Sequence, residues 1–212
     1  PAQDWPGLGC PGTYPDRSAG AVEIDGGPAA ERVAQAVFGE VPLVRAPTKL
    51  GRLADWMAAE GVAMSFHHHM GTVIERAHEV DRLMEGTPES VGLLYDTGHL
   101  TFAGDDPAEV ARKWARRINH VHAKDVRPDV LKRAREGRWS FLESVINGVY
   151  TVPGDGMVDF EAALRPVADA GYGGWIICEA EQDPAKAHPL TYARKGYAHL
   201  RATAEKLGLA VQ

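Results

Sequence analysis

The stretch VGLLYDTGHL, residues 91–100, decides how the fold is interpreted. It opens with a short apolar run and passes at once into the polar tetrapeptide DTGH at 96–99. Similar apolar runs recur along the chain from about residue 52, and helical patterns separate them. This alternation is typical of a parallel β-sheet with crossover helices. The predicted strands are 62–67, 91–95, 118–122 and 174–178, with a weaker one at 149–152.

Local cap patterns predict where the intervening helices begin. Asp106 followed by Pro107 is typical of a helix N-terminus, and it predicts one helix from this point. Thr72 and Glu75 have the spacing of a capping box, which predicts a second helix at about 73–85. The remaining predicted helices are about 160–170, with Asp159 as its cap and Pro166 as a kink, and about 190–207.

Composition and charge limit the class of protein. With 44% hydrophobic and 25% charged residues, the chain of 212 residues is an ordinary globular one. The net charge of -6 and the scattered lysines and arginines argue against nucleic acid as a partner. No stretch approaches the roughly 20 apolar residues of a membrane span, so no membrane partner is expected. Cys10 and Cys178 form no CxxC pair, and Cys178 lies in an apolar run, so we expect a free thiol and a cytoplasmic protein.

The beginning of the chain differs from the rest. Residues 1–45 are rich in proline and glycine, and they contain one convincing apolar period, near Val33 to Phe38. We therefore expect an irregular N-terminal segment at 1–45 and a barrel portion at 46–212. An α/β barrel usually needs about 250 residues, so the chain is short for that architecture.

Polar side chains follow four of the predicted strands. In parallel α/β sheets, reactive residues gather at the carboxyl ends of the strands, because the loops there face one crevice. Carboxylate and imidazole groups together suit a divalent ion such as Mn, Co, Mg or Zn. The sequence therefore predicts a metal site at one rim of the sheet. The four strand ends read HHH at 67–69, DTGH at 96–99, HAKD at 122–125 and EAE at 179–181.

Side-chain alternation along a strand separates inward from outward positions. His120 and His122 point to the same side, and His122 lies nearer the rim, so His120 is expected to pack more deeply. In the histidine triplet, His67 and His69 are expected to point inward and His68 outward.

Several strand-end residues have a second interpretation. Asp96 can cap its own turn instead of binding a metal, although the apolar run before it places it at a strand end. Glu75 fits a helix cap better than a substrate contact. Glu179 ends its apolar run and should reach the centre, whereas Glu181 contacts either substrate or solvent. Lys124 is expected to hold a substrate oxygen, to act as acid or base, or to cover the rim as a surface lysine.

Five stretches of the chain carry a family resemblance. They are HHHMGTVIE at 67–75, LLYDTGHLTFAGDDP at 93–107, INHVHAKDVR at 118–127, SFLESVINGVYTVPGDG at 140–156 and EAEQDPAKAHPLTYARKGY at 179–197. These stretches closely resemble the inosose dehydratases of inositol catabolism. That family belongs to the xylose-isomerase-like barrel superfamily, which also holds sugar epimerases, dehydroshikimate dehydratases and an AP endonuclease branch. The resemblance runs from about Leu53 to the C-terminus.

The resemblance implies a (β/α)8 TIM barrel of the xylose-isomerase-like type, of which this chain would supply strands four to eight, with the first three missing or atypical. It also implies a divalent metal, usually manganese or cobalt, with magnesium or zinc as alternatives. The implied reaction is loss of water from 2-keto-myo-inositol, a polyol ketone, to give a trihydroxycyclohexane-1,2-dione in myo-inositol catabolism. Removal of the C–H proton next to the carbonyl would leave an enediolate that the metal stabilises.

The resemblance implies roles for single residues as well. In the superfamily the metal is commonly held by Glu, Asp, His and Glu, and the last three fall on Asp96, His122 and Glu179. The first falls on His67, in place of the usual glutamate, with His69 and Glu75 as rivals. His99, in the Asp-x-x-His pattern, looks like a substrate-binding residue. The candidates for base and acid are His99, His69, Lys124 and Glu181, and the sequence does not assign which does which.

Two alternatives stay open. A metal-dependent ketose epimerase or isomerase on the same fold would share the four ligands and the enediolate. The chain would otherwise be an inactive barrel fragment that binds metal without turnover. An open half barrel would also expose apolar faces, which favours a homo-oligomer.

Overall fold

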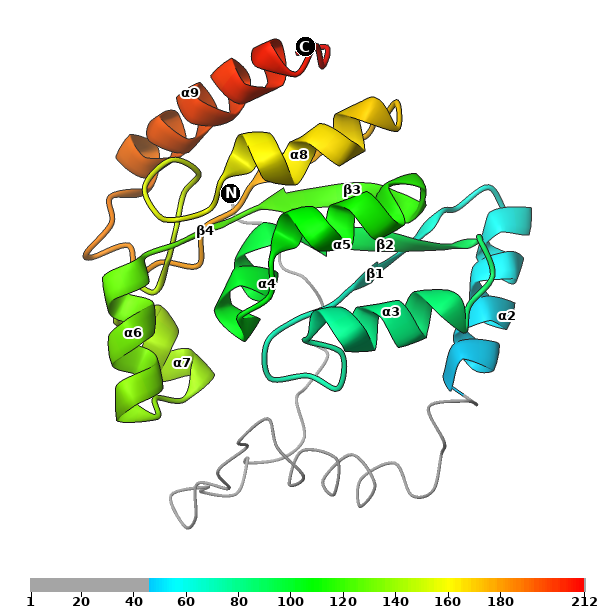
Figure 1. Ribbon diagram of the computed structural model, residues 1–212, viewed down its shortest axis with the longest axis horizontal. Helices are drawn as coiled ribbons and strands as arrows, with labels where there is room; N and C mark the ends of the chain where they lie inside the picture. The colour runs from blue at the N-terminus through cyan, green and yellow to red at the C-terminus, as the bar shows by residue number, and fades with distance from the viewer. Residues whose placement is uncertain (1–45, 212) are drawn as a thin grey trace, which may run out of the picture.

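The computed structural model describes residues 46–211. The predicted irregular segment at 1–45, with its apolar period near Val33 to Phe38, lies outside the described residues. Within 46–211, four strands form one parallel sheet (Figure 1). Each matches one of the four stronger predicted runs to within two residues. In sheet order the strands are β1 (Met64–His67), β2 (Val91–Asp96), β3 (Ile118–Ala123) and β6 (Ile176–Cys178).

The parallel register brings the carboxyl ends of the strands to one edge. Asp96 on β2 pairs with His122 on β3, and His67 at the end of β1 pairs with Leu94. Because alternate residues of a strand face opposite sides of the sheet, these pairings decide which side chains share a face. The polar strand-end residues therefore meet on one face at one edge.

Helices connect the strands and cover the face of the sheet opposite the polar strand-end residues. Figure 1 shows α6 and α7 gathered at the end of the molecule to which β4 leads. None of the helices in the described part of the chain is both long and apolar enough to cross a membrane. The helices are α2 (Ala46–Ala59), α3 (Ala77–Glu85), α4 (Thr97–Ala103), α5 (Pro107–Trp114), α6 (Pro128–Gly137), α7 (Phe141–Ile146), α8 (Phe160–Asp169) and α9 (Pro189–Lys206), with a 3-10 turn, η1, at Ala115–Arg117.

The main core lies between the sheet and its helices. Leu93 and Tyr95 on β2 are fully buried, and they belong to the same apolar cluster as Val80 of α3 and Leu164 of α8. The Tyr95 hydroxyl donates to the carbonyl oxygen of Ala163 at 3.3 Å, so its polar end is satisfied as well. Burial of this kind is worth about 1.5–3 kcal/mol for each large apolar side chain, and it fixes the sheet on which the site is built.

Most of the predicted helix starts are confirmed. Asp106 caps α5 by accepting a hydrogen bond from the N–H of Ala108 at 2.9 Å, with Pro107 as the first helical residue. Asp159 caps α8 in the same way, through the N–H of Ala162 at 3.0 Å. Side-chain caps satisfy N–H groups that have no partner inside the helix.

The predicted helix at 73–85 is wrong in its first turn, because α3 begins at Ala77. The carboxylate of Glu79 accepts hydrogen bonds from the two N–H groups that precede the helix, at 2.8 and 2.9 Å. The hydroxyl of Thr72 instead donates to the carbonyl oxygen of His69 at 2.8 Å and closes a loop. Glu79, four residues after Glu75, therefore caps this helix, and the predicted role of Glu75 is wrong.

The weak strand predicted at 149–152 does not join the parallel sheet. Its residues form β5 (Tyr150–Thr151), which pairs antiparallel with β4 (Asp125–Val126) in a separate ribbon. The chain leaves the sheet directly after β3, and Arg127 binds the carbonyl oxygen of Tyr150 at 3.1 Å. The described residues therefore contribute four strands to the parallel sheet, not the five expected for strands four to eight.

Candidate functional site

Side chains from all four strand ends meet at one edge of the sheet. One ligand atom each from His67, Asp96 and His122 lies within 4.8 Å of the other two. Oδ2 of Asp96 is 3.4 Å from Nε2 of His67 and 3.6 Å from Nδ1 of His122. The carboxylate of Glu179 completes the cluster, with its Oε2 at 2.8 Å from Nδ1 of His122. We call these four residues the strand-end cluster.

The ligand atoms of the strand-end cluster lack hydrogen-bond partners. In the described part of the chain, five buried side-chain polar atoms are unpartnered, and four of them are His67 Nε2, Asp96 Oδ2, His122 Nδ1 and Glu179 Oε2. The close approach of His122 to Glu179 does not have hydrogen-bonding geometry. Since buried polar atoms are nearly always paired, four exceptions at one point indicate a site shaped for a ligand. Two imidazole nitrogens and two carboxylate oxygens form a donor set that fits a divalent cation.

Asp96 caps its own turn with one oxygen and leaves the other oxygen free for the strand-end cluster. Its Oδ1 accepts the N–H of His99 at 2.9 Å and caps α4, whereas its Oδ2 faces the strand-end cluster. The N–H of Asp96 is held in turn by Nε2 of His68 at 3.3 Å. The cap and the backbone contact fix the direction in which Oδ2 points.

Neighbouring opposite charges shift the pKa values of the residues in the strand-end cluster. The contacts with Asp96 and Glu179 raise the pKa of His122 to about 9, since two carboxylates stabilise its imidazolium. Burial alone would raise the pKa of Asp96, but contacts with His122, His67 and Lys124 hold it well below its ordinary value. Burial would raise the pKa of Glu179, but the contacts with His122 and Lys124 together outweigh burial and lower it.

Lys124 is not the surface lysine that was one of its predicted roles, because its side chain is fully buried. Its Nζ lies 3.0 Å from Oε2 of Glu181, 3.1 Å from Oε2 of Glu179 and 3.4 Å from Oδ2 of Asp96. Burial would lower the pKa of Lys124, but the three carboxylates outweigh it and raise the pKa. The ammonium is therefore a stable charge that donates hydrogen bonds.

His99 is neutral, and its two nitrogens are both occupied. Burial lowers the pKa of His99 to about 2. A lysine ammonium can only donate, so the 3.0 Å contact with Lys124 makes Nε2 of His99 an acceptor. Nδ1 then carries the hydrogen and donates to the hydroxyl of Tyr150 at 3.1 Å, while the N–H of Met70 approaches Nδ1 less closely, at 3.4 Å. This pairing leaves His99 poorly suited to accept a substrate proton.

His69 keeps one nitrogen available. Its Nδ1 lies 2.7 Å from the carbonyl oxygen of Met70, which requires a hydrogen on Nδ1. Among the described residues no hydrogen bond engages Nε2, and the half-buried ring packs 3.7 Å from the ring of His99. His69, His99 and Glu181 form a second group whose ligand atoms lie within 4.8 Å of one another.

The other predicted candidates lie outside both groups. His68 is fully buried against the backbone of Asp96, and burial lowers its pKa to about 4. His120 is half-buried, with its ring centroid 5.3 Å from that of His122. Glu75 accepts the N–H of Gly71 at 2.9 Å and closes the loop after the histidine triplet, instead of capping a helix.

Two aromatic residues beside the site were missed in the sequence. Phe141, the first residue of α7, packs its ring 5.3 Å from that of His69 and 6.1 Å from that of His99. The fully buried ring of Tyr150 lies 5.3 Å from His99 and 5.0 Å from the ammonium of Lys124. Both belong to the stretch at 140–156 that carries part of the family resemblance, which was the available signal.

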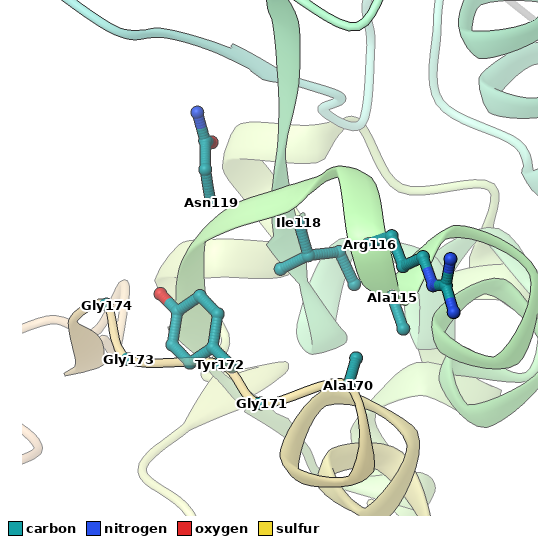
Figure 2. Close-up of a pocket in the computed structure, with 9 residues that line it drawn as sticks. All are labelled: Ala115, Arg116, Ile118, Asn119, Ala170, Gly171, Tyr172, Gly173 and Gly174. Atoms are coloured by element: carbon teal, nitrogen blue, oxygen red, sulfur yellow. The ribbon is translucent and has the colours of Figure 1, made fainter.

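A cavity of about 320 Å³ lies near the other end of β3 (Figure 2). Figure 2 shows Asn119 pointing away from the other labelled residues, and its Nδ2 donates to the carbonyl oxygen of Met64 at 2.9 Å. No carboxylate or imidazole belongs to this lining, so it lacks the chemistry of the strand-end cluster. The lining residues are Ala115, Arg116, Ile118, Asn119, Ala170, Gly171, Tyr172, Gly173 and Gly174.

A family model described as "Xylose isomerase-like TIM barrel" matches residues 39–203 of the chain. The chain belongs to the xylose isomerase-like TIM barrel family. This membership confirms the predicted fold class and agrees with the parallel sheet and its helices. An eight-stranded barrel of this family needs four strands beyond those in the described part of this chain.

Curated relatives of the chain support the resemblance to inosose dehydratases. The rhizopine catabolism protein MocC of Rhizobium meliloti is 55% identical over 160 residues, covering 76% of this chain and 49% of that protein. An inosose dehydratase of Geobacillus thermodenitrificans is 52% identical over 155 residues, covering 73% of this chain and 52% of that protein. The chain thus spans about half the length of the curated relatives it matches.

Solved structures agree with the xylose isomerase-like TIM barrel fold. A D-tagatose 3-epimerase-like protein matches with a TM-score of 0.54 at 18% identity, covering 76% of this chain and 54% of that chain. The IOLI protein with a bound zinc atom matches with a TM-score of 0.50 at 18% identity, covering 74% of this chain and 53% of that chain. Identities this low support the fold alone.

Proposed function

We propose that the chain is the metal-binding part of an inosose dehydratase, which removes water from 2-keto-myo-inositol to give a trihydroxycyclohexane-1,2-dione. The observation that carries this proposal is the convergence of four buried, unpartnered ligand atoms at the strand ends. The 52% identity to an inosose dehydratase supplies the substrate class.

The proposed ligands are His67 Nε2, Asp96 Oδ2, His122 Nδ1 and Glu179 Oε2. A divalent ion bound there would polarise the substrate carbonyl and acidify the neighbouring C–H bond. Manganese or cobalt is our first choice, with magnesium or zinc as alternatives, and the IOLI structure with its zinc atom supports a metal on this fold.

His69 is the base that we propose. Its Nδ1–H is held by the carbonyl oxygen of Met70, so the lone pair of Nε2 is free to take the proton from the carbon next to the carbonyl. The hydroxyl group on the next carbon then leaves with the bonding electron pair and takes a proton, which the His69 imidazolium returns. One proton and one hydroxide leave the substrate, so the sum is one water.

Lys124 stabilises the negative charge that develops on the substrate oxygen during proton removal. Its raised pKa keeps it charged, and a buried ammonium acts more strongly than an exposed one. His99 and Glu181 hold the ammonium in place at 3.0 Å each. The ring of Phe141 packs edge-on against that of His69, with ring centroids 5.3 Å apart, and would shield that side of the base from water.

The experiment is a turnover assay with an inosose and added manganese. Glu179→Gln and His122→Ala are each expected to reduce the rate at least about 100-fold, because each removes a ligand. Asp129→Asn, on the exposed side of α6, is the matched control and should keep the wild-type rate. Circular dichroism shows whether each variant is folded. Wild-type turnover in either ligand variant would remove the proposed site.

A metal-dependent ketose epimerase is the second candidate, because the structural likeness to the D-tagatose 3-epimerase-like protein covers 76% of this chain. It would use the same proton removal but would return the proton to the opposite face of the carbon. Product analysis separates the two, since a dione supports the dehydratase and an interconverted ketose supports the epimerase. Metal binding without either product would identify the chain as an inactive fragment.

The proposal also covers the binding partner, the cellular location and the oligomeric state of the chain. We expect a small polyol ketone as partner, not nucleic acid, in keeping with the net charge of -6, and a cytoplasmic location. Trp175 is 74% exposed beside the edge strand β6, and Ile177 on that strand is 37% exposed, which supports the expected self-association. Size-exclusion chromatography with light scattering tests that expectation.

A further inference from the structure

We propose that the strand ends form two adjoining cation positions that share Asp96. One position is open to a divalent ion, and the other is filled by the ammonium of Lys124. When Lys124 is replaced by a neutral residue, the second position accepts a divalent ion through His69, His99 and Glu181. This inference rests on the proposed metal site for the first position only.

The surroundings of the Lys124 ammonium resemble those of a metal ion more than those of a lysine in an ordinary ion pair. Four acceptor atoms lie within 3.4 Å of Nζ, contributed by His99, Glu181, Glu179 and Asp96. Only His99 and Glu181 are hydrogen-bonded to the ammonium, so Oε2 of Glu179 and Oδ2 of Asp96 stay close to Lys124 without a hydrogen-bond partner. Carboxylate oxygens and an imidazole nitrogen are also the donor types that bind Mn, Co and Zn.

The ligands of the second position are already assembled. His69, His99 and Glu181 each offer an atom within 4.8 Å of the other two. Nε2 of His99 and Oε2 of Glu181 are 3.8 Å apart, and both bind Lys124. Nε2 of His69 has no hydrogen-bond partner in the described residues, so a third ligand is available without rearranging other contacts.

The fold is built to hold a cation at this point. A Cβ at Gly98 would lie 2.6 Å from Cγ of Lys124, so the glycine leaves room for the aliphatic part of the lysine. The ring of Tyr150 lies 5.0 Å from the ammonium and favours a positive charge there. These contacts come from α4 and β5, which are distant in sequence from β3, so several elements enclose one charge.

The balance of charge explains why a second ion replaces the ammonium. Asp96, Glu179 and Glu181 carry three negative charges, which one divalent ion and one ammonium neutralise. A neutral residue at 124 leaves a negative charge that is uncompensated in a buried place, and that state is strongly unfavourable. A second divalent ion removes that negative charge and leaves one positive charge, which a hydroxide ion from solvent can neutralise.

The test is metal stoichiometry. The chain is stripped of metal, titrated with cobalt(II) and desalted, and bound cobalt per chain is measured by mass spectrometry, with the visible absorption of the bound ion as a second readout. The wild type is expected to bind one ion and Lys124→Met two, while the double variant Lys124→Met/His69→Ala returns to one. Lys113→Met is the matched control, because Lys113 also pairs with two carboxylates but lies outside the site.

The decisive quantity is the difference between Lys124→Met and the wild type. One additional ion supports the inference, and an equal number overturns it while leaving the proposed function intact. A wild type that binds no ion contradicts the proposed function, and the difference of one ion still decides the inference. Lys124→Gln serves as a second neutral variant, and failure of both variants to fold in excess cobalt also overturns the inference, because the second ion should replace the lost charge.

Discussion

The hydroxyl of Thr97 makes hydrogen bonds with both the N–H and the carbonyl oxygen of Lys124. Its Oγ1 accepts the N–H of Lys124 at 3.0 Å and donates to the carbonyl oxygen of the same residue at 2.7 Å. Thr97 is the first residue of α4, and Lys124 follows the last residue of β3, so one hydroxyl ties a helix start to a strand end. The lysine at the centre of the site is thereby fixed through its main chain as well as its side chain.

Thr97→Val tests this tie. The change keeps the shape of the side chain but removes both hydrogen bonds and leaves the buried N–H of Lys124 unpaired, which costs about 1–3 kcal/mol in the free energy of unfolding. Urea denaturation measures the loss. Thr191→Val, at an exposed position of α9, is the control. The Thr191 hydroxyl has one exposed contact, with Nδ1 of His188 at 3.1 Å, so its loss should change stability by less than about 0.5 kcal/mol. Equal effects of the two changes would contradict the role of Thr97.

Gly98→Ala tests the fit between α4 and Lys124. The added methyl group would lie 2.6–2.7 Å from three carbons of the buried lysine side chain, and overpacking of this kind costs about 1–3 kcal/mol. Gly173→Ala is the control, because a Cβ at Gly173 meets nothing within 4 Å. Thermal unfolding of both variants measures the difference, and a Gly98→Ala protein as stable as Gly173→Ala would show that Lys124 is free to move aside.

Asp125→Asn should loosen the loop that follows β5. The buried carboxylate of Asp125 accepts N–H groups from Gly154, Gly156 and Val158 at 2.9–3.0 Å, and that of Val126 at 2.8 Å. In asparagine an NH2 group replaces one of the two carboxylate oxygens, and this donor would face other N–H donors. We therefore expect the free energy of unfolding to fall by about 2–3 kcal/mol. Hydrogen exchange at Gly154 and Gly156 should become faster. Asp129→Asn, exposed on α6, should change neither quantity.

Asp155 makes the stability of the fold depend on pH, and stability should fall as the pH falls. Burial would raise its pKa, but contacts with Lys195, Thr151 and Arg127 outweigh burial and lower it. A carboxyl with a lowered folded-state pKa stabilises the fold above its unfolded-state pKa of about 3.9 and loses that contribution as the pH falls through the folded-state value. Asp155→Asn should therefore destabilise the protein at pH 7, and the difference should shrink towards about pH 3. A difference that does not change with pH would contradict this assignment.

Removal of metal should lower the melting temperature. At a free metal concentration of about 100 times Kd, binding adds about 2.7 kcal/mol to stability, which corresponds to a shift of about 5–10 °C for a chain of this size. A chelator should reverse the shift. His122→Ala should melt at the same temperature with and without metal, and a retained shift in that variant would place the bound ion elsewhere.

The sequence predicted the four parallel strands and the gathering of their end residues, because both depend on local patterns. An apolar run followed by a polar residue marks a strand end wherever it occurs, and parallel pairing brings such ends together. The side chains of Asp96, His122 and Glu179 therefore could be expected at one edge. Their role as metal ligands stays a prediction.

Other features depended on contacts between distant segments. The burial of Lys124 requires Gly98 on another element, and nothing near residue 124 indicates it. The ribbon of β4 and β5 depends on Asp125 binding N–H groups some 30 residues further along the chain. The sequence pattern indicates Glu75 as the cap of this helix, and only the structure shows that Glu79 is the cap of α3.

The ribbon of β4 and β5 lies outside the parallel sheet, and α6 and α7 sit between its two strands in the sequence. Phe141, which covers His69, is thus carried by an excursion that contributes no strand to the sheet. In the proposed dehydratase, Phe141 would form part of the wall beside the substrate, and substitutions at Phe141 should leave the proposed metal ligands in place. We therefore expect directed evolution of substrate selectivity to succeed first in this excursion.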